Sequence, residues 1–572
     1  MTKLSFKARV RFISVIVIGI ALILIAKLFY LQIVDKNFYT KKADDQYVVP
    51  IGSIFNRGNI LFSSKDNSLV AAATIASGYK LAINPIEIKD PESDYKILSP
   101  YLSIGHNLFI SRASKKNDPY EEVADHLTED QANKIKILHL PGVSLYKENW
   151  RFYPGGDLAA QTIGFIGYNG KSDIRTGQYG LERYYNDVLS KPMGQVYINF
   201  FAQIFSNIEN EISSIEKQQG DVVTTIEPNV EHFLQSEMSD TLQKWKADLA
   251  GGIIINPKNG EIYAMVGVPS FNPNNFSKVS NISVYRNPNV QDVFEFGSVI
   301  KPLVMAAALN EGVVTPETTY LDKGVVKVDG KNIYNFDKRG RGVATMQTVL
   351  DQSLNTGMVF VEHQMGHDLF RKDIESYGIG EKTGIDLPNE ASGLISNLNS
   401  PRDIEYANAS FGQGIAITPI EAVRAFCSLT NGGKLITPHV VKQIKYDDGL
   451  VKNLNYPVSS DTLFSPKTSE TIDHMLVHIF EYYENGKYKF PHYSVATKTG
   501  TAQIAEPNGG GYYSDRYLHS FFGFFPAYNP KFLVFLYLKD PKGVEYSSQT
   551  LIKPFINTVK FLLNYYNVPP DR

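Results

Sequence analysis

The chain has 572 residues, more than one hydrophobic core usually organises, so two or more domains are expected. Its 57 Lys and Arg residues and 59 Asp and Glu residues nearly cancel without forming a basic block, which argues against a nucleic-acid partner. The single cysteine, Cys427, excludes an intramolecular disulfide and a cysteine-rich metal cluster, and its apolar surroundings predict a buried helical thiol.

Residues 12–34 form an almost continuous apolar stretch, long enough as a helix to span a hydrocarbon core of about 30 Å. Its one charge, Lys27, lies toward the end of the stretch, where the side chain can reach the interface. Basic residues without any acid precede the stretch, and the charges that follow it balance. The positive-inside rule therefore predicts a single-pass anchor in the inner (cytoplasmic) membrane, with residues 1–11 as a cytoplasmic tail and the rest outside. A cleaved signal peptide is the alternative, but no small-x-small site ends the run.

Residues 35–216 are mixed and polar and carry no cluster of catalytic groups, which predicts a pedestal domain. A strand is expected at 79–83, and the charged segment 119–137 has helical spacing. After Asp221 the pattern changes to a β-type run followed by helical spacing over 230–249. The second domain is therefore expected to comprise residues 217–572.

The second domain is predicted to contain an antiparallel sheet flanked by helices, so the chain as a whole belongs to the α+β multidomain class. Asn259-Gly260 favours a hairpin between strands at 252–257 and 261–266. Three strands return near the end and precede a closing helix at 551–565; they are expected at 494–503, 519–525 and 532–538. The last of them is apolar on both faces, which predicts a central strand covered by helices on each side. A long helical insertion separates the first two strands from these three.

The first candidate site lies at residues 296–302, where Ser298 and Lys301 open an apolar helical run. Residues at i and i+3 share one face of a helix, so the lysine amine can act as the base that a serine nucleophile needs. A place in the first helical turn also surrounds Ser298 with backbone N–H groups that can hold an oxyanion. The alternative is an N-cap serine followed by a surface lysine.

The second motif, Ser353-Leu354-Asn355, places a hydroxyl and an amide two residues apart. On a loop between helices both can face one cleft, where the hydroxyl would relay a proton and the amide would hold a substrate amide. Alone, ordinary helix capping explains the triplet equally well.

The third motif is a β-type run of four residues, Lys498, Thr499, Gly500 and Thr501. The lysine and the glycine face one side of such a strand, and the two threonines face the other. The ammonium and the hydroxyls would recognise an anionic end group such as a carboxylate, and the glycine would let a substrate approach the backbone. A solvated edge strand is the alternative for the isolated motif.

Together the three motifs match the set found in serine acyl-transfer enzymes that act on β-lactams and peptidoglycan, except that Leu354 replaces an aspartate. The chain resembles the class B penicillin-binding proteins, and the resemblance covers most of the chain after the anchor. Further segments similar to family motifs lie at 56–60, 151–155, 180–182, 256–262 and 409–414. Phe296 departs from the proline that is commoner before Gly-Ser in this family.

The resemblance implies a peptidoglycan D,D-transpeptidase of cell-wall synthesis, active in cell division or in maintaining cell shape. Ser298, deprotonated by Lys301, would attack a stem peptide ending in D-Ala-D-Ala, release D-Ala, and pass the acyl group to an amine of a neighbouring stem. The remaining roles implied by the family are proton relay and amide holding for Ser353 and Asn355, and carboxylate binding for Lys498, Thr499 and Thr501, with Gly500 as a further substrate-binding residue. Backbone N–H groups of Ser298 and Thr501 would form the oxyanion hole.

The same resemblance implies β-lactams as inhibitors, with a glycosyltransferase and division or elongation proteins as partners. It requires no cofactor and no metal. His363 and His367 stand at i and i+4, but the glutamate of a zinc-binding H-E-x-x-H motif does not follow His363, and a surface helix is favoured.

Three other functions share parts of the pattern. A β-lactamase needs a glutamate that deacylates the enzyme, and the candidate, Glu390, lies in a turn-like segment where a structural role is favoured. A D,D-carboxypeptidase would use water as the acceptor in the same site. A penicillin-binding receptor or division scaffold would be acylated, or not, without turnover.

Overall fold

A computed structural model describes residues 19, 20, 27, 56–168, 175–190, 219–507, 509 and 511–572. The chain divides into two compact units, one made of residues 1–56 and 76–150 and the other of residues 57–75 and 151–572. Apart from three positions, the predicted anchor at 12–34 lies outside the described residues. Within the described residues, no helix combines the length and the hydrophobicity needed to cross a bilayer.

Among the described residues, the smaller unit is built on three paired strands and three helices. The strands are the second half of β2 (Leu69–Ile83), β3 (Glu121–Leu127) and β4 (Val143–Phe152), and the helices are α3 (Pro91–Leu98), α4 (His106–Ala113) and α5 (Glu129–Ile137). The helix expected at 119–137 is therefore wrong in its first half. Val123 and Leu127 are buried four positions apart, which imitates helical spacing, but β3 pairs with a bulged stretch of β2. The helix starts only after Thr128, which forms a capping box.

The larger unit contains a first sheet in the order β16-β15-β7-β1-β2. Its strands besides β2 are β1 (Ile60–Ser63), β7 (Gly220–Thr224), β15 (Val441–Tyr446) and β16 (Val451–Asn453). Strands β1 and β7 run parallel, so residues near 60 and near 222 lie side by side. Residues 57–75 and 151–190 thus fold within the same unit as the second half of the chain, whereas the boundary expected from the sequence lies at 217.

Short elements follow β4 in the chain, and a buried ionic cluster connects one of them, α7 (Gly180–Tyr184), to Arg57 and Arg151. The others are α6 (Ala160–Ile163), β5 (Ile166–Tyr168), β6 (Arg175–Gly177) and α8 (Asn186–Leu189). The Glu182 carboxylate accepts hydrogen bonds from Arg57 Nε and Arg151 Nε, each at 2.6 Å. All three side chains are almost completely buried, so the two guanidinium groups compensate one carboxylate away from water.

The second sheet has the order β18-β19-β20-β8-β9 and is entirely antiparallel. Its strands are β8 (Leu249–Ile255), β9 (Ile262–Val268), β18 (Ala496–Ala505), β19 (Tyr512–Phe525) and β20 (Phe532–Lys539). The predicted order, with two strands before the helical insertion and three after it, is confirmed. Strand β20 is central and buried on both faces, as its continuous hydrophobicity predicts.

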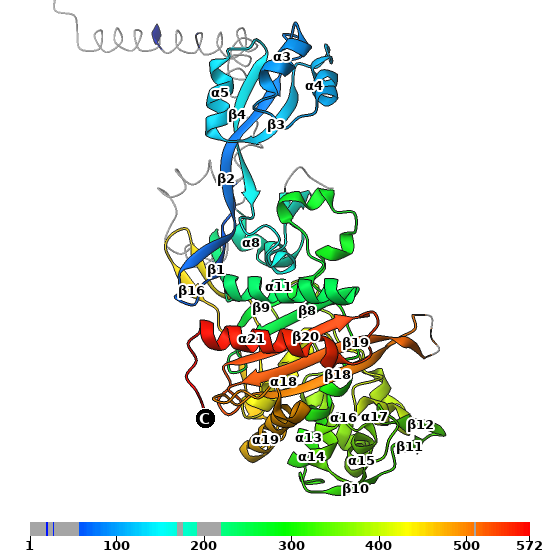
Figure 1. Ribbon diagram of the computed structural model, residues 1–572. Helices are drawn as coiled ribbons and strands as arrows, with labels where there is room; N and C mark the ends of the chain where they lie inside the picture. The colour runs from blue at the N-terminus through cyan, green and yellow to red at the C-terminus, as the bar shows by residue number, and fades with distance from the viewer. Residues whose placement is uncertain are drawn as a thin grey trace, which may run out of the picture. The chain divides into compact units, whose positions relative to one another are not determined.

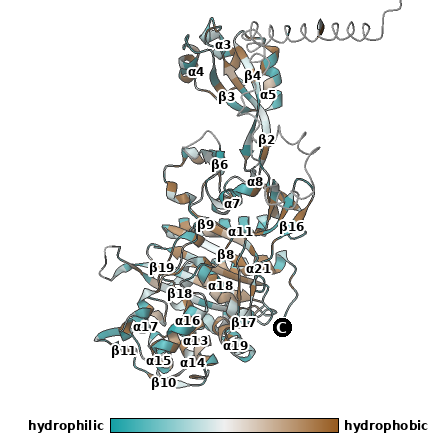
Figure 2. Cartoon of the chain, turned by 180° about the vertical axis from the view of Figure 1, so that it is seen from behind, coloured by the Kyte–Doolittle hydropathy of each residue, from teal (hydrophilic) through white to brown (hydrophobic). Residues whose placement is uncertain are grey.

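Helices cover both faces of this sheet (Figure 1). Strand residues alternate between the faces: Ile254 and Val534 pack with α11 (Pro228–Trp245) and α21 (Ile552–Tyr565), while Ile253 and Phe535 belong to the opposite core. That opposite core includes α18 (Pro419–Thr430), and Figure 2 shows hydrophobic residues concentrated in β8 and α18. Cys427 is buried in α18, as predicted, and burial raises the pKa of its thiol.

The insertion between β9 and β18 supplies most of the walls around the candidate site. Its main helices are α13 (Lys301–Asn310), α14 (Met346–Asp351), α15 (Asn355–Met365), α16 (His367–Ser376), α17 (Asp403–Ala409), α18 and α19 (Pro466–Tyr482). Its small strands are β10 (Thr319–Asp322), β11 (Val325–Val328), β12 (Lys331–Tyr334), β13 (Gly342–Thr345), β14 (Lys434–Ile436) and β17 (Val458–Thr462). Strand β10 pairs with β13 and β11 with β12.

Candidate active site

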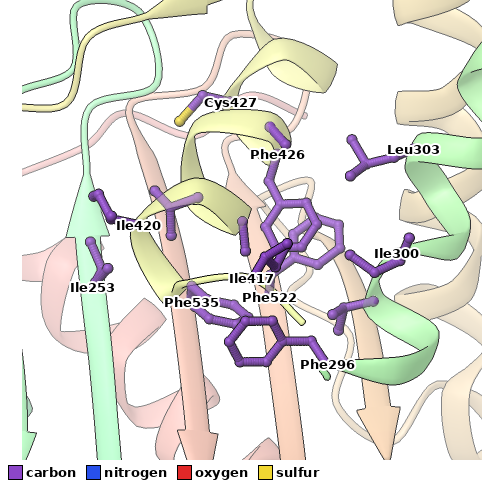
Figure 3. Close-up of a cluster of buried hydrophobic side chains, with 14 of the residues drawn as sticks. Ile253, Phe296, Ile300, Leu303, Ile417, Ile420, Phe426, Cys427, Phe522 and Phe535 are labelled. Carbon is purple, nitrogen blue, oxygen red and sulfur yellow. The ribbon is translucent and has the colours of Figure 1, made fainter. Parts of the chain in front are cut away.

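Ser298 lies on a tight turn that leads into α13. Residues Gly297–Val299 form a single 3-10 turn, and the α-helix begins at Lys301 with Pro302 in its first turn, where a proline costs no hydrogen bond. The turn is anchored by Phe296, whose ring is buried and meets Phe535 edge to face at 5.0 Å (Figure 3). A bulky apolar residue before Gly-Ser therefore fixes the turn to the sheet through the hydrophobic core.

Glycines let this turn lie directly against the neighbouring backbone. Gly297 has φ 65°, and a Cβ atom there would lie 2.7 Å from the Thr501 carbonyl oxygen on β18. A Cβ atom on Gly412, which has φ 81°, would collide with the carbonyl oxygen of Gly297. The N–H of Gly297 donates to the carbonyl of Gly412 at 3.1 Å. Main-chain contacts thus bring Ser298 next to β18.

The second motif forms a short loop between two helices. Helix α14 ends at Asp351 and α15 begins at Asn355. Between them Ser353 has φ 53°, a left-handed conformation that costs a serine about 1 kcal/mol or more. The middle residue, Leu354, is fully buried. The loop therefore directs the hydroxyl and the amide of the motif outward while its apolar residue holds it in the core.

The amines of Lys301 and Lys498 both reach this loop. Lys301 Nζ donates to the backbone oxygen of Ser353 at 2.6 Å and to Asn355 Oδ1 at 2.8 Å, and it lies 3.3 Å from Ser353 Oγ. Lys498 Nζ approaches the same hydroxyl at 3.0 Å and also donates to the Thr499 carbonyl at 3.0 Å. The Ser353 hydroxyl is thus a bridge between two lysines.

Burial shifts the charge state of both lysines. Lys301 is 0% and Lys498 2% exposed. Desolvation, and then the charge of Lys498, hold the pKa of Lys301 well below its usual range. Desolvation lowers the pKa of Lys498 to about 7, although the charge of Asp351 opposes this shift. An amine whose pKa lies well below its usual range can act as a base, and the ammonium form of Lys498 can bind an anion.

The third motif lies on β18 with the predicted alternation. Lys498 and Gly500 are buried, while Thr499 and Thr501 are half-buried. Thr501 Oγ1 accepts a hydrogen bond from the Ser547 N–H at 3.1 Å, so its proton remains free to be donated. A Cβ atom on Gly500 would collide with Ser520 Oγ and with the Phe296 carbonyl oxygen. The glycine is thus required because β18 lies against the Ser298 turn at this position. From the sequence, the glycine was expected instead to make room for a substrate.

One cleft of about 610 Å³ unites the three motifs. The predicted site residues that line it are Ser298, Ser353, Asn355, Lys498, Thr499 and Thr501. Lys301 and Gly500 do not line the cleft: Lys301 is fully buried, and Gly500 faces the Ser298 turn. Its outer walls contain aromatic residues, and the rings of Phe336 and Tyr546 meet at 5.7 Å.

Sequence reasoning missed several groups at this cleft. The carbonyl of Tyr334 accepts a hydrogen bond from Asn355 Nδ2 at 3.0 Å, Ser547 supports Thr501, and Asp351 lines the cleft two residues before Ser353. No motif marks these positions; only Asp351 carried a signal, as an acid close to Ser353 in the chain.

Two groups that the sequence raised as alternatives have other contacts. Glu390 Oε1 accepts hydrogen bonds from the N–H and the hydroxyl of Thr383, each at 2.6 Å, and it is absent from the residues that line the cleft. His367 stacks on Tyr406, with ring centroids 3.9 Å apart. Glu390 thus stabilises a turn, as a structural glutamate would.

Family models match both parts of the chain. Residues 250–559 match the penicillin binding protein transpeptidase domain, and residues 55–225 match the penicillin-binding protein dimerisation domain. The chain is 29% identical to stage V sporulation protein D of Bacillus subtilis over 567 residues, which cover 98% of this chain and 86% of that protein. It is 27% identical to peptidoglycan D,D-transpeptidase FtsI of Buchnera aphidicola from Schizaphis graminum over 571 residues, covering 98% and 96%.

Solved structures share the fold. Penicillin binding protein 2X from Streptococcus thermophilus superposes with a TM-score of 0.71 at 20% identity, covering 90% of this chain and 80% of that one. Penicillin binding protein 3 of Mycobacterium tuberculosis, in complex with aztreonam, gives a TM-score of 0.66 at 22% identity, covering 90% and 97%.

Proposed function

The chain belongs to the class B penicillin-binding proteins, and from that membership we propose that it is a peptidoglycan D,D-transpeptidase acylated at Ser298. The observation that carries the proposal is the convergence of three distant motifs on one cleft, where two buried lysines share the hydroxyl of Ser353. Such convergence of a serine, a neutral amine and an anion binder is what acyl transfer requires.

In the first step Lys301 accepts the proton of the Ser298 hydroxyl, and the oxygen attacks the carbonyl carbon of the penultimate D-Ala of a stem peptide. The C–N bond to the terminal D-Ala breaks, and its amine leaves with a proton delivered through Ser353, which contacts both lysines. The oxyanion is held by the N–H groups of Ser298 and Thr501, and the close approach of Gly297 to the Thr501 carbonyl supports this assignment. An amine of a second stem then attacks the ester, restores the serine and forms the cross-link.

Substrate recognition is assigned to β18 and the Ser353 loop. Lys498 and the hydroxyls of Thr499 and Thr501 bind the terminal carboxylate, because all three line the cleft and combine a cation with two hydroxyl donors. Asn355, held by Lys301 and by the carbonyl of Tyr334, presents its amide to the substrate backbone. Gly500 lets β18 lie close to the Ser298 turn.

The anchor at 12–34 and the partner proteins belong to the same proposal. Hydropathy and the basic residues before the stretch support a single-pass orientation with the cleft outside the cytoplasmic membrane. The glycan strands would come from a separate glycosyltransferase, because no group in this chain is assigned to polymerisation.

Labelling with a fluorescent penicillin tests the acylation site. The full-length protein is expected to be labelled, and Ser298→Ala is expected to lose the label, while Ser376→Ala on α16 retains it. Release of D-Ala from a D-Ala-D-Ala peptide, with an added amine competing against water, separates transpeptidation from carboxypeptidation. Undiminished labelling of the Ser298 variant would refute the assignment.

A further inference from the structure

Asp351 is held rigidly at the edge of the cleft. Its Oδ1 atom accepts hydrogen bonds from Gln347 Nε2 at 2.7 Å, within α14, and from His478 Nδ1 on α19 at 3.0 Å. Gln347 Nε2 also contacts the carbonyl of Met475 at 3.2 Å, which ties the two helices together. The carboxylate is three-quarters buried and lines the cleft. Because a carboxylate only accepts hydrogen bonds, Nδ1 of His478 carries the proton.

This acid distinguishes between the two buried lysines. Lys301 and Lys498 share the Ser353 hydroxyl and repel one another when both are charged. The charge of Asp351 favours the ammonium form of Lys498, whereas the influences on Lys301 are burial and Lys498 itself. In a cleft of low dielectric such a charge acts without direct contact. The titratable or charged groups that contact Asp351 or Ser353 are His478 on α19, Lys301 on α13 and Lys498 on β18. Those that line the cleft with Asp351 and Lys498 are Tyr334, Lys338, Arg341, Tyr483, Tyr517, Glu545 and Tyr546.

We propose that Asp351, fixed by His478 and Gln347, is a positioning residue that stabilises the protonated form of Lys498 and so leaves Lys301 free to act as the base. The proposal rests on the proposed function, because it assigns opposite charge states to the two lysines of that site. It explains how two similar amines beside one hydroxyl perform different tasks, because Asp351 and Lys498 both line the cleft and Lys301 is not among its lining residues. His478 acts through Asp351, since it orients the carboxylate that acts on Lys498.

The pH profile of acylation by a fluorescent penicillin tests this role. The acid limb follows deprotonation of Lys301, and the alkaline limb follows loss of the charge on Lys498. Asp351→Asn is expected to move the alkaline limb to lower pH by roughly one unit, which is about a tenfold loss of rate on that limb, and to leave the rate maximum within about threefold. Asp351→Glu restores the limb, and His478→Gln gives a smaller shift in the same direction.

Asp368→Asn is the matched control, because its side chain is 98% exposed on α16 and it removes the same charge. A uniform loss of rate at every pH, or an unchanged profile in a stably folded Asp351→Asn protein, would overturn the role proposed for Asp351. Failure of the proposed function has another signature, namely a wild-type protein that is not labelled or a Ser298→Ala protein that is. Thermal unfolding of each variant establishes that it is folded.

Discussion

Replacing Lys301 by arginine isolates the task of the buried amine. An ordinary lysine with a pKa of 10.5 would be neutral in only about one molecule in 3,000 at pH 7. Complete burial and the neighbouring Lys498 lower the pKa of Lys301, so the folded protein gains up to about that factor in neutral base. Arginine keeps the positive charge and cannot be deprotonated.

We therefore expect Lys301→Arg to lower the acylation rate at pH 7 by about 10³-fold or more, within the range of general-base catalysis. The assay is the second-order rate of labelling by a fluorescent penicillin between pH 5 and pH 10. The wild-type acid limb should lie well below the usual lysine range. An acid limb near pH 10, or a variant that acylates within tenfold of wild type, would contradict a neutral Lys301.

Three further predictions concern stability as well as activity. Lys498→Met should lose acylation yet unfold at a higher temperature than wild type at pH 7. The pKa of Lys498 is about 7 in the folded protein and 10.5 in the unfolded chain, so the stability of the wild type rises with pH across this window. The difference in unfolding temperature between the two proteins should therefore disappear by pH 10. A less stable variant at pH 7 would refute the burial penalty. Gly500→Ala should lower the free energy of unfolding by about 1–3 kcal/mol and remove most of the acylation rate, because β18 must move away from the Ser298 turn. Denaturant titration measures the stability and penicillin labelling measures the rate. Labelling at the wild-type rate would contradict the close contact at Gly500. Glu182→Gln should cost about 3–5 kcal/mol by leaving two buried guanidinium groups uncompensated. The control in the same titration is Glu129→Gln, at an exposed position of α5.

Periodic hydrophobicity predicted the second sheet well. Strand β20 is apolar on both faces and lies in the centre, and the Asn-Gly turn joins β8 to β9 as expected. Where a strand imitated helical spacing, as at Val123 and Leu127 in β3, the pattern misled. Pairing of β1 with β7 links residues about 160 positions apart, and such long-range contacts leave no trace in local spacing.

The candidate site was predicted as a set of motifs, but not as a network. Spacing put Ser298, Ser353 and Lys498 in candidate motifs, and the structure brings all three to one cleft. Spacing did not indicate that both lysines share the Ser353 hydroxyl, nor that Asp351 lies beside them, because these contacts depend on how α14, α19 and β18 pack. The reason for Gly500 likewise became clear only from the backbone facing it.

The main-chain contacts of Gly297, Gly412 and Gly500 restrict how this protein can escape an inhibitor by mutation. Under the proposed function, any side chain at these three places would push a carbonyl oxygen or a strand away from Ser298, and turnover of the natural peptide would suffer together with acylation by the inhibitor. Tolerated resistance changes should therefore accumulate on the outer walls, around Phe336 and Tyr546, where bulk can be altered without displacing the backbone that performs the chemistry.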